Sequence, residues 1–303
     1  MQLPALALAA AAGRRQRTVE LAKEIEDRGF AGIYCASFGD SLGLCVSIAH
    51  ATSRLQFGTA IANIYTRHAF EMAQAGAYIH EISGGRFWLG IGVSHGRTND
   101  RLGLDTGKPL TDIRNYVAQM RAVEQQVGPL PPVVLATLRR KMTALAGEVG
   151  QGAVWANASR SHLGTSLAEI DASQREGDGF FIGDMLPTCI DEDEEAAAAV
   201  MRRTLTSYLM LPNYRNYWKE AGYVEEMEAV EAALANRDAE RLPALMSDRW
   251  LNDCTLHGPR KKVLDGLDAW YAAGMKTPIL VASSTSGGQM QAFEEIFEAF
   301  RGA

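Results

Sequence analysis

The chain has 303 residues, of which 47% are hydrophobic and 22% are charged, which is typical of a globular protein with a large core. Its formal net charge is −6, whereas nucleic-acid binders usually carry a basic stripe. The composition therefore argues against a nucleic-acid partner and favours a small-molecule substrate.

The four cysteines form no C-x-x-C pair, and the six histidines show no recognised ligand spacing. This pattern predicts reduced thiols in a cytoplasmic protein and no metal site. The apolar start of the chain has no basic residues before it, so it resembles a buried strand more than a signal peptide. No apolar stretch reaches the length that crosses a bilayer, so no membrane association is expected.

Eight short apolar runs are typical of parallel strands that are buried on both faces. Helical patterns separate them, and eight strand–helix repeats correspond to an α/β fold, the (β/α)8 TIM barrel. An open doubly wound sheet is the alternative, but Gly90-Ile91-Gly92 does not continue into a dinucleotide-binding fingerprint. The runs are Leu3–Ala9, Ala31–Ala36, Leu55–Ile61, Arg86–Gly92, Val133–Thr137, Ala153–Asn157, Gly179–Cys189 and Pro278–Ala282.

The first repeat shows this pattern most clearly. Thr18 is predicted to cap a helix over residues 19–28, and Gly29 is predicted to end it. Further helices are expected after the other strands, at about 42–53, 68–82, 109–126, 139–149, 192–210 and 260–273.

Two stretches interrupt the regular spacing. Residues 158–178 are rich in Ser, His, Asp and Gly and predict a mobile loop after the sixth strand. Residues 191–259 predict a long helical insertion before the last strand, and the acidic residues 191–195 suit the N-terminus of its first helix. We therefore expect a single barrel domain over residues 1–303 that carries these two insertions.

Barrel enzymes place their active sites at the carboxyl ends of the strands, where polar residues of this chain collect. His95 follows the fourth run between Gly92 and Gly96, and a histidine can donate or accept a proton near neutral pH. The alternative is a histidine that only bonds a loop carbonyl. His95 is therefore the first candidate for a catalytic residue.

Cations follow the third and fifth runs. Two roles are considered for Arg67, which could hold an acidic group or form an ion pair with Glu71, whereas His68 is expected to have a structural role. Three cations at 139–141 open a helix, where positive charge opposes the helix dipole. A bound phosphate would explain them, because helix N-termini offer free N–H groups to anions, and an ordinary basic surface is the alternative.

Several segments resemble the bacterial luciferase-like flavin oxidoreductases, and most closely the branch that uses the deazaflavin coenzyme F420. The resemblance covers most of residues 18–160 and, more weakly, 179–285. The segment from Ser83-Gly84-Gly85-Arg86-Phe87 to Gly90-Ile91-Gly92-Val93 is specific to this family but not to one flavin type. The other matching segments are 51–61, 65–68 and 142–152.

This resemblance implies a barrel that holds the flavin-type ring at its C-terminal mouth, beside a cis peptide bond at Ala60-Ile61. It also implies that Asn63 contacts the ring, that Val93 and Ser94 contact it through the backbone, and that His95 transfers a proton. We place Asn157, at the end of the sixth run, with the cofactor-binding residues. The residues that match the phosphate-binding segment are Leu138, Arg139, Lys141 and Met142.

One departure from the family concerns the end of the second strand, where F420-dependent relatives usually carry Asp-His. Ser37 and Phe38 stand there in this chain, so we prefer His95 over Asp40 as the proton donor. The leading hypothesis is F420-dependent hydride transfer to or from a small organic substrate. The alternatives are an FMN-dependent monooxygenase supplied by a partner flavin reductase, and a non-catalytic barrel. The family also implies a homodimer.

Overall fold

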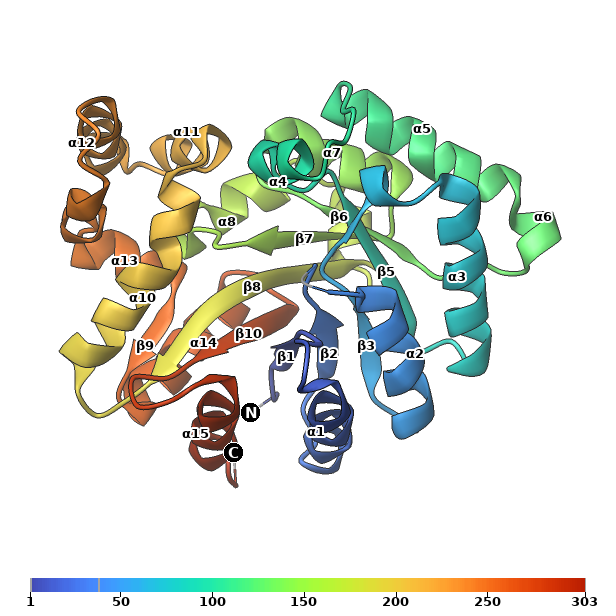
Figure 1. Cartoon of the computed structure of the whole chain (residues 1–303), viewed down its shortest axis with the longest axis horizontal. Coiled ribbons are helices and arrows are strands. Elements are labelled where there is room, and N and C mark those ends of the chain that lie inside the picture. Colours follow the sequence, from blue (N-terminus) through green and yellow to red (C-terminus); the bar gives the residue numbers. More distant parts are fainter. Residues whose placement is uncertain (1, 38, 303) are drawn as a thin grey trace. The chain divides into compact units, whose positions relative to one another are not determined.

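The computed structural model describes residues 2–37 and 39–302 (Figure 1). It divides into two compact units, each considered in turn. The first unit comprises Gln2–Trp155 and Leu167–Gly183, and the second comprises residues 156–166 and 184–302. The single-domain organisation expected from the sequence stays a prediction.

The first unit alternates strands and helices from its start, as the apolar runs predict. Its helices α1 (Arg15–Asp27), α2 (Ser41–Ala51), α3 (Ala69–Ile82) and α5 (Pro109–Ala122) pack in succession along its strands (Figure 1). Its strands are β1 (Ala5–Leu8), β2 (Gly32–Cys35), β3 (Gln56–Thr59), β4 (Ala62–Asn63), β5 (Phe87–Gly92), β6 (Val133–Ala136) and β7 (Gly152–Ala156), the last residue of which belongs to the second unit. Its helices are α1 (Arg15–Asp27), α2 (Ser41–Ala51), η1 (Ile64–Thr66), α3 (Ala69–Ile82), α4 (Gly96–Arg101), α5 (Pro109–Ala122), α6 (Glu124–Val127), α7 (Arg140–Val149) and α9 (Ala172–Glu176).

All strand pairs of the first unit are parallel, in the order β1, β2, β3, β5, β6, β7. The short strand β4 also pairs with β5. Because the pairing is parallel, all these strands end at the same edge of the sheet. β1 and β2 are buried along their whole length, as expected for strands covered on both faces.

The second unit is mainly helical, and its strands are also parallel. Strand β8 (Phe181–Ile190) begins in the first unit and pairs with β9 (Leu256–Gly258) and with β10 (Thr277–Ser283). Helices fill the predicted insertion as far as Cys254, and Asp193 caps the first of them as the acidic run suggests, but these helices precede β9 and not the last strand. Its helices are α8 (Arg160–Leu167), α10 (Glu194–Leu209), α11 (Pro212–Glu220), α12 (Val224–Ala235), η2 (Ala239–Leu245), α13 (Asp248–Cys254), α14 (Arg260–Ala272) and α15 (Gln289–Ala299).

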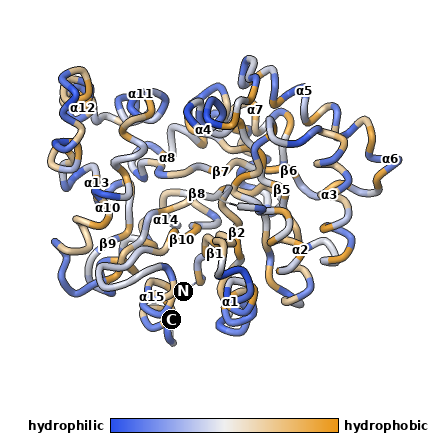
Figure 2. The backbone as a smooth tube through the Cα atoms, in the orientation of Figure 1, coloured by the Kyte–Doolittle hydropathy of each residue, from blue (hydrophilic) through white to orange (hydrophobic). Residues whose placement is uncertain are grey.

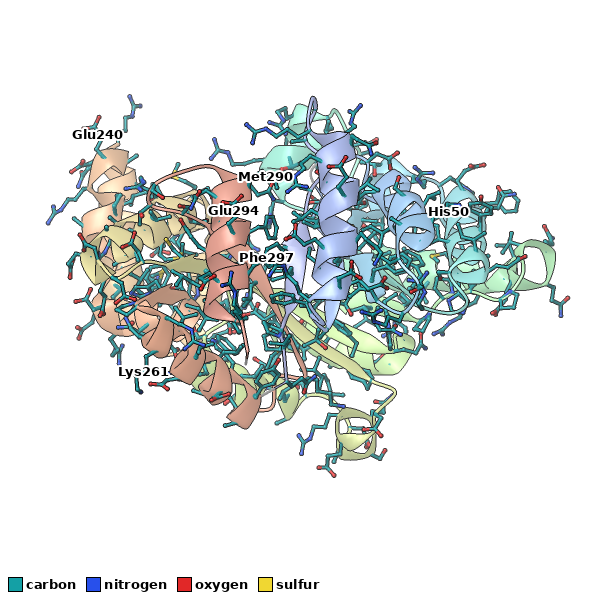
Figure 3. All side chains as sticks on the ribbon, turned by 90° about the horizontal axis from the view of Figure 1, so that it is seen from below. His50, Glu240, Lys261, Met290, Glu294 and Phe297 are labelled. Atoms are coloured by element: carbon teal, nitrogen blue, oxygen red, sulfur yellow. The ribbon has the colours of Figure 1, made fainter. Side chains whose placement is uncertain are left out.

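Hydropathy follows this division between strand and helix. Figure 2 shows hydrophobic residues along the strands, whereas α4 is hydrophilic throughout. Charged side chains lie on the outer faces of the helices of the second unit, including Lys261 on α14, Glu240 in η2 and Glu294 on α15 (Figure 3). On the same helix, Phe297 is buried.

Three sequence predictions of local structure were wrong. Helix α1 begins at Arg15 rather than after Thr18, whose hydroxyl donates to the carbonyl of Arg14 inside the helix. The region 158–178, predicted to be a loop, contains the helices α8 and α9 in spite of its polar composition. Asp171 caps the second of these helices, α9. The strands β4 and β9 were not predicted, since two or three residues form no apolar run.

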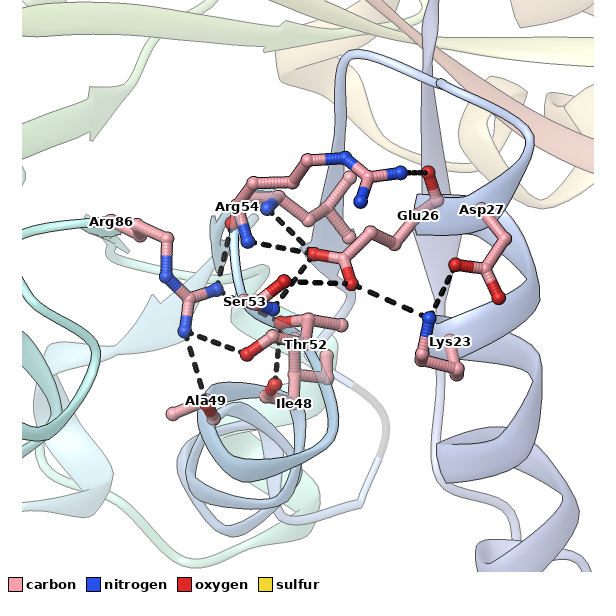
Figure 4. A network of polar contacts seen from close by, with 10 residues as sticks. Lys23, Glu26, Asp27, Ile48, Ala49, Thr52, Ser53, Arg54 and Arg86 are labelled. Carbon is pink, nitrogen blue, oxygen red and sulfur yellow. Dashed lines mark hydrogen bonds and ion pairs between the residues drawn. The ribbon is translucent and has the colours of Figure 1, made fainter.

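Two oppositely charged side chains hold the turn between α2 and β3 (Figure 4). The carboxylate of Glu26 accepts hydrogen bonds from the backbone N–H groups of Ser53, Arg54 and Leu55, at 2.8, 2.8 and 3.0 Å. On the other side, the guanidinium of Arg86 donates to the carbonyls of Ala49, Thr52, Leu55 and Ser83 at 2.8–3.0 Å. The turn therefore has its N–H groups paired with an anion and its carbonyls paired with a cation.

The pKa of Glu26 reflects this arrangement. Burial by itself would raise the pKa, but the three backbone N–H groups and the charge of Arg54 lower it to about 2. Because this value lies below that of an unfolded glutamate, the carboxylate stabilises the fold fully above pH 4.5. The stabilisation is lost as the pH falls from there towards 2.

We expect Glu26→Gln to lower the free energy of unfolding at pH 7 by about 3 kcal/mol, because a pKa lowered from 4.5 to about 2 corresponds to roughly that amount. The difference between variant and wild type should shrink as the pH falls below 4.5. Urea unfolding at pH 7, 5 and 3 would measure it. Glu24→Gln is the matched control, because Glu24 makes a surface ion pair with Arg28 and should contribute less than about 1 kcal/mol. Parallel pH profiles for wild type and Glu26→Gln would contradict the role of the carboxylate.

Candidate active site

Three neighbouring strand ends bring together most of the residues that the sequence suggested. In the parallel register, Asn63 at the end of β4 lies opposite Gly92 at the end of β5. Ile91 of β5 in turn lies opposite Leu135 of β6. The segments that follow these strands therefore start side by side at the carboxyl edge of the first unit.

The peptide bond Ala60-Ile61 is cis, which confirms the prediction. It lies between β3 and β4, and the N–H of Ala60 donates to the carbonyl of Cys35 at 2.8 Å. Ala60 is buried and Ile61 is half-buried. Close packing requires a glycine opposite them, because a Cβ at Gly92 would lie 2.7 Å from Ala136 and 3.2 Å from Ile61.

The side chain of Asn63 is held by two hydrogen bonds. Its Oδ1 accepts from the N–H of Tyr65 at 3.1 Å, and its Nδ2 donates to Oδ1 of Asn99 at 2.9 Å. Asn99 on α4 also donates through Nδ2 to the carbonyl of Val93 at 2.9 Å. Asn63 and Val93, which the family resemblance placed together, are thus joined through a residue that the sequence did not single out.

The loop after β5 carries the candidate catalytic residue. Ser94 has a φ of 56°, a left-handed conformation that is uncommon outside glycine. His95 immediately precedes α4, and its carbonyl accepts from the N–H groups of Thr98 and Asn99 at 2.9 and 3.0 Å. Its side chain is half-buried, and burial lowers its pKa below the ordinary value. At neutral pH the imidazole is therefore mainly neutral, with one N–H donor and one acceptor nitrogen.

The N-terminus of α7 lies directly after β6 and carries the predicted phosphate-binding residues. Arg139 precedes the helix and Lys141 is its second residue, and both side chains are exposed. Arg140 between them forms an ion pair with Glu169, with 2.7 Å between Nε and Oε1. The flanking Leu138 and Met142 are half-buried. Such a helix end, with exposed cations beside the first N–H groups of the helix, suits an anion.

Asn157 belongs to the second unit, where it begins a buried turn with a φ of 57°. Its carbonyl accepts from Nε1 of Trp218 at 3.3 Å, and the N–H of Ser159 donates to the hydroxyl of Tyr217 at 3.0 Å. Oδ1 of Asp184 accepts from the N–H of Ala158 at 3.4 Å. Asp184 is fully buried, which raises its pKa to about 7 although the N–H groups of Ala158 and Met185 oppose the rise. The turn is therefore held by α11 of the insertion and by β8.

The other polar candidates have structural contacts. Asp40 caps α2 by accepting from the N–H of Gly43 at 3.0 Å, and His68 caps α3 through Nδ1 at 3.2 Å from the N–H of Phe70. Arg67 is exposed and lines an open cavity with His68 and Tyr116. Ser37 is exposed, and Phe38 lies outside the described residues.

Within residues 2–37 and 39–302, no group of three or more His, Cys, Asp or Glu side chains is arranged to hold a metal ion. The four cysteines are buried and unbridged, and the sulfur atoms of Cys35 and Cys45 lie 3.7 Å apart. None of the described helices is both long and apolar enough to span a bilayer.

Comparison with known proteins finds a reductase among the curated relatives, and an F420-dependent enzyme and an FMN complex among the structures of similar fold. The chain is 27% identical over 204 residues to a 5,10-methylenetetrahydromethanopterin reductase of Methanolobus tindarius, covering 59% of this chain and 62% of the relative. The structure matches a coenzyme F420-dependent tetrahydromethanopterin reductase from Methanopyrus kandleri with a TM-score of 0.77 and 19% identity, over 99% of this chain and 98% of the other. This likeness confirms the (β/α)8-barrel fold.

A flavin monooxygenase is also similar in fold. The oxygenating constituent of the Pseudomonas putida 3,6-diketocamphane monooxygenase, solved in complex with FMN, matches with a TM-score of 0.60 and 14% identity, covering 93% of this chain and 92% of the other. The model of the luciferase-like monooxygenase family matches residues 4–277. Together with the barrel fold, that match over most of the chain shows that the protein belongs to the luciferase-like monooxygenase family.

Proposed function

We propose that this protein is a coenzyme F420-dependent oxidoreductase that transfers a hydride to or from a small organic substrate. The observation that carries the proposal is the joined arrangement at the carboxyl edge of the first unit, where Asn99 bonds both Asn63 and Val93 and where His95 lies two residues after Val93. The higher TM-score to the F420-dependent reductase, 0.77 against 0.60 for the FMN-dependent monooxygenase, supports F420 over FMN.

The residues present fit a flavin-type cofactor. Ile61 and Val93 offer half-buried apolar surface for a flat ring, and the loop at Ser94 offers backbone polar groups. The N-terminus of α7 offers Arg139 and Lys141 to the cofactor phosphate. When bound, F420 supplies a ring carbon that accepts or donates a hydride, which protein side chains alone do not provide.

His95 is the residue of this edge that is suited to moving the accompanying proton. Its lowered pKa keeps one ring nitrogen unprotonated at neutral pH, so that nitrogen can accept a proton from a substrate hydroxyl. In the reverse direction, the protonated imidazole of His95 returns the proton to the substrate. The Asp-His pair of F420-dependent relatives is absent, and Asp40 is engaged as a helix cap. His95 therefore takes the role of proton donor and acceptor in this proposal.

The second candidate is an FMN-dependent monooxygenase, supported by the match to the FMN complex and by the absence of the Asp-His pair. Such an enzyme would depend on a partner reductase for reduced flavin. The third hypothesis, a non-catalytic barrel, predicts that neither cofactor binds.

We also propose a homodimer, in keeping with the family resemblance, which sedimentation of the purified protein would test.

The first prediction from this proposal concerns cofactor choice. Titrating the purified protein into F420 and into FMN should quench F420 fluorescence saturably and bind FMN at least about tenfold more weakly, a difference of about 1.4 kcal/mol. The opposite preference would establish the monooxygenase hypothesis. Absence of binding to either cofactor would leave the non-catalytic barrel.

The second prediction concerns the cations at α7. The double variant Arg139→Ala/Lys141→Ala should weaken cofactor binding by at least about tenfold, because charge-assisted contacts to phosphate are worth about 1.5–3 kcal/mol. Arg140→Ala is the comparison at the same helix end, because it removes one exposed cation whose guanidinium forms an ion pair with Glu169. Equal affinities for all three proteins would assign these cations to the solvated surface.

The third prediction concerns His95. His95→Ala should lower turnover by about 10²- to 10⁴-fold while nearly preserving cofactor affinity, as expected for loss of a general acid or base. The pH profile of kcat should also lose a titration below the usual histidine pKa, because burial lowers the pKa of His95. Weakened cofactor binding with unchanged turnover would mean that His95 positions the ring. Unchanged binding and turnover would leave the residue without a role in the reaction.

A further inference from the structure

Asn99 is a buried polar residue on an exposed helix. Helix α4 has the sequence GRTNDR, and Asn99 is 4% exposed whereas Arg97, Asp100 and Arg101 are exposed. A buried amide is stable only when its donors and acceptors find partners. The hydrogen-bond partners of Asn99 therefore show which parts of the candidate site this residue holds.

Three hydrogen bonds connect Asn99 to three different residues of the candidate site. Its Nδ2 donates to the carbonyl of Val93 at 2.9 Å, and its Oδ1 accepts from Nδ2 of Asn63 at 2.9 Å. Its backbone N–H donates to the carbonyl of His95 at 3.0 Å. One residue thus bridges the end of β4 and both sides of Ser94 in the loop after β5.

The loop needs such a bridge. Ser94 is left-handed, a conformation that costs a non-glycine residue free energy and persists only where its surroundings fix it. His95, which precedes α4, gives no side-chain cap to the helix. The side chain and N–H of Asn99 fix the carbonyls of Val93 and His95, on either side of Ser94.

The chemistry selects an amide at this position. A side chain must donate to the carbonyl of Val93 and accept from the amide of Asn63 at the same time. An aspartate of the same shape accepts but cannot donate when ionised, and it would direct a negative oxygen at the Val93 carbonyl. An apolar side chain does neither, and it leaves two polar groups without partners.

We propose that Asn99 is the positioning residue of the cofactor-ring site, holding Asn63 and the loop Val93–His95 in the single arrangement that receives the ring. The inference rests on the proposed flavin-type function and names a residue on which that function depends. Asn99 acts through Asn63 and Val93 and needs no contact with the cofactor itself.

The test compares Asn99→Ala and Asn99→Asp with Asp100→Ala, an exposed neighbour on the same helix. Both Asn99 variants should weaken F420 or FMN binding, whichever the wild type prefers, by about 10- to 100-fold, because each leaves buried groups unpaired. Asp100→Ala should bind like the wild type. Asn99 variants that bind as tightly as Asp100→Ala would overturn the proposal.

A double-mutant cycle with Asn63→Ala separates positioning from a general loss of stability. If Asn99 acts through Asn63, the double variant Asn63→Ala/Asn99→Ala should weaken binding by clearly less than the product of the two single effects. Multiplicative effects would show that the two residues act independently and would overturn this step of the inference.

Hydrogen exchange of the ligand-free protein tests the same idea without any cofactor. The N–H of Thr98, which donates to the carbonyl of His95 at 2.9 Å, should exchange faster in Asn99→Ala than in Asp100→Ala, while the exchange of β1 and β2 stays unchanged. Unchanged exchange at Thr98 would overturn the inference. A wild type that binds neither F420 nor FMN would instead overturn the proposed function, and the exchange result would still decide whether Asn99 fixes the loop.

Discussion

The candidate site depends on the parallel register between β4 and β5, which places Asn63 opposite Gly92. A shift of one residue would turn the side chains of β4 to the other face of the sheet and separate Asn63 from the loop after β5. Backbone packing restricts this register further. A Cβ at Gly90 would lie 1.9 Å from the carbonyl oxygen of Thr59, and a Cβ at Gly92 would collide with Ala136. The two glycines therefore let β3, β5 and β6 approach closely where the site begins.

The hydrogen bonds that Glu26 and Arg86 make to the turn before β3 support the register between β4 and β5 from the opposite end of β3. The turn that they hold leads directly into β3, and Thr59 at the end of β3 donates through Oγ1 to the carbonyl of Gly90 at 2.6 Å. Both ends of the strand are thus fixed by side-chain to backbone hydrogen bonds. A binding site needs its residues held to within about 0.5 Å, and such supporting contacts are what provides that precision.

The sequence predicted the barrel because its strands are buried on both faces and form apolar runs. It did not predict β4 and β9, which are too short to show a periodicity. The helices α8 and α9 were missed because their polar composition resembles that of a loop, although Asp171 caps α9.

The same contrast applies to the site. The family resemblance and the position after a strand suggested His95, Asn63 and Val93. Nothing in the local sequence distinguishes Asn99 from its polar neighbours. Its importance comes from burial and from hydrogen bonds to Asn63, 36 residues away in the chain, which no local pattern can reveal.

Helix α4 connects the two roles proposed for this edge of the sheet, which are contact with the cofactor ring and transfer of a proton. It begins directly after His95, and it carries Asn99 four positions further on. Because the N–H of Asn99 donates to the carbonyl of His95, the backbone that carries the imidazole is held by the residue that also holds Asn63 and Val93. In the proposed reaction, hydride and proton must move in a fixed geometry, since small displacements of reacting groups reduce rates strongly. One short helix that fixes both the residues proposed to contact the ring and the residue proposed to transfer the proton satisfies this requirement.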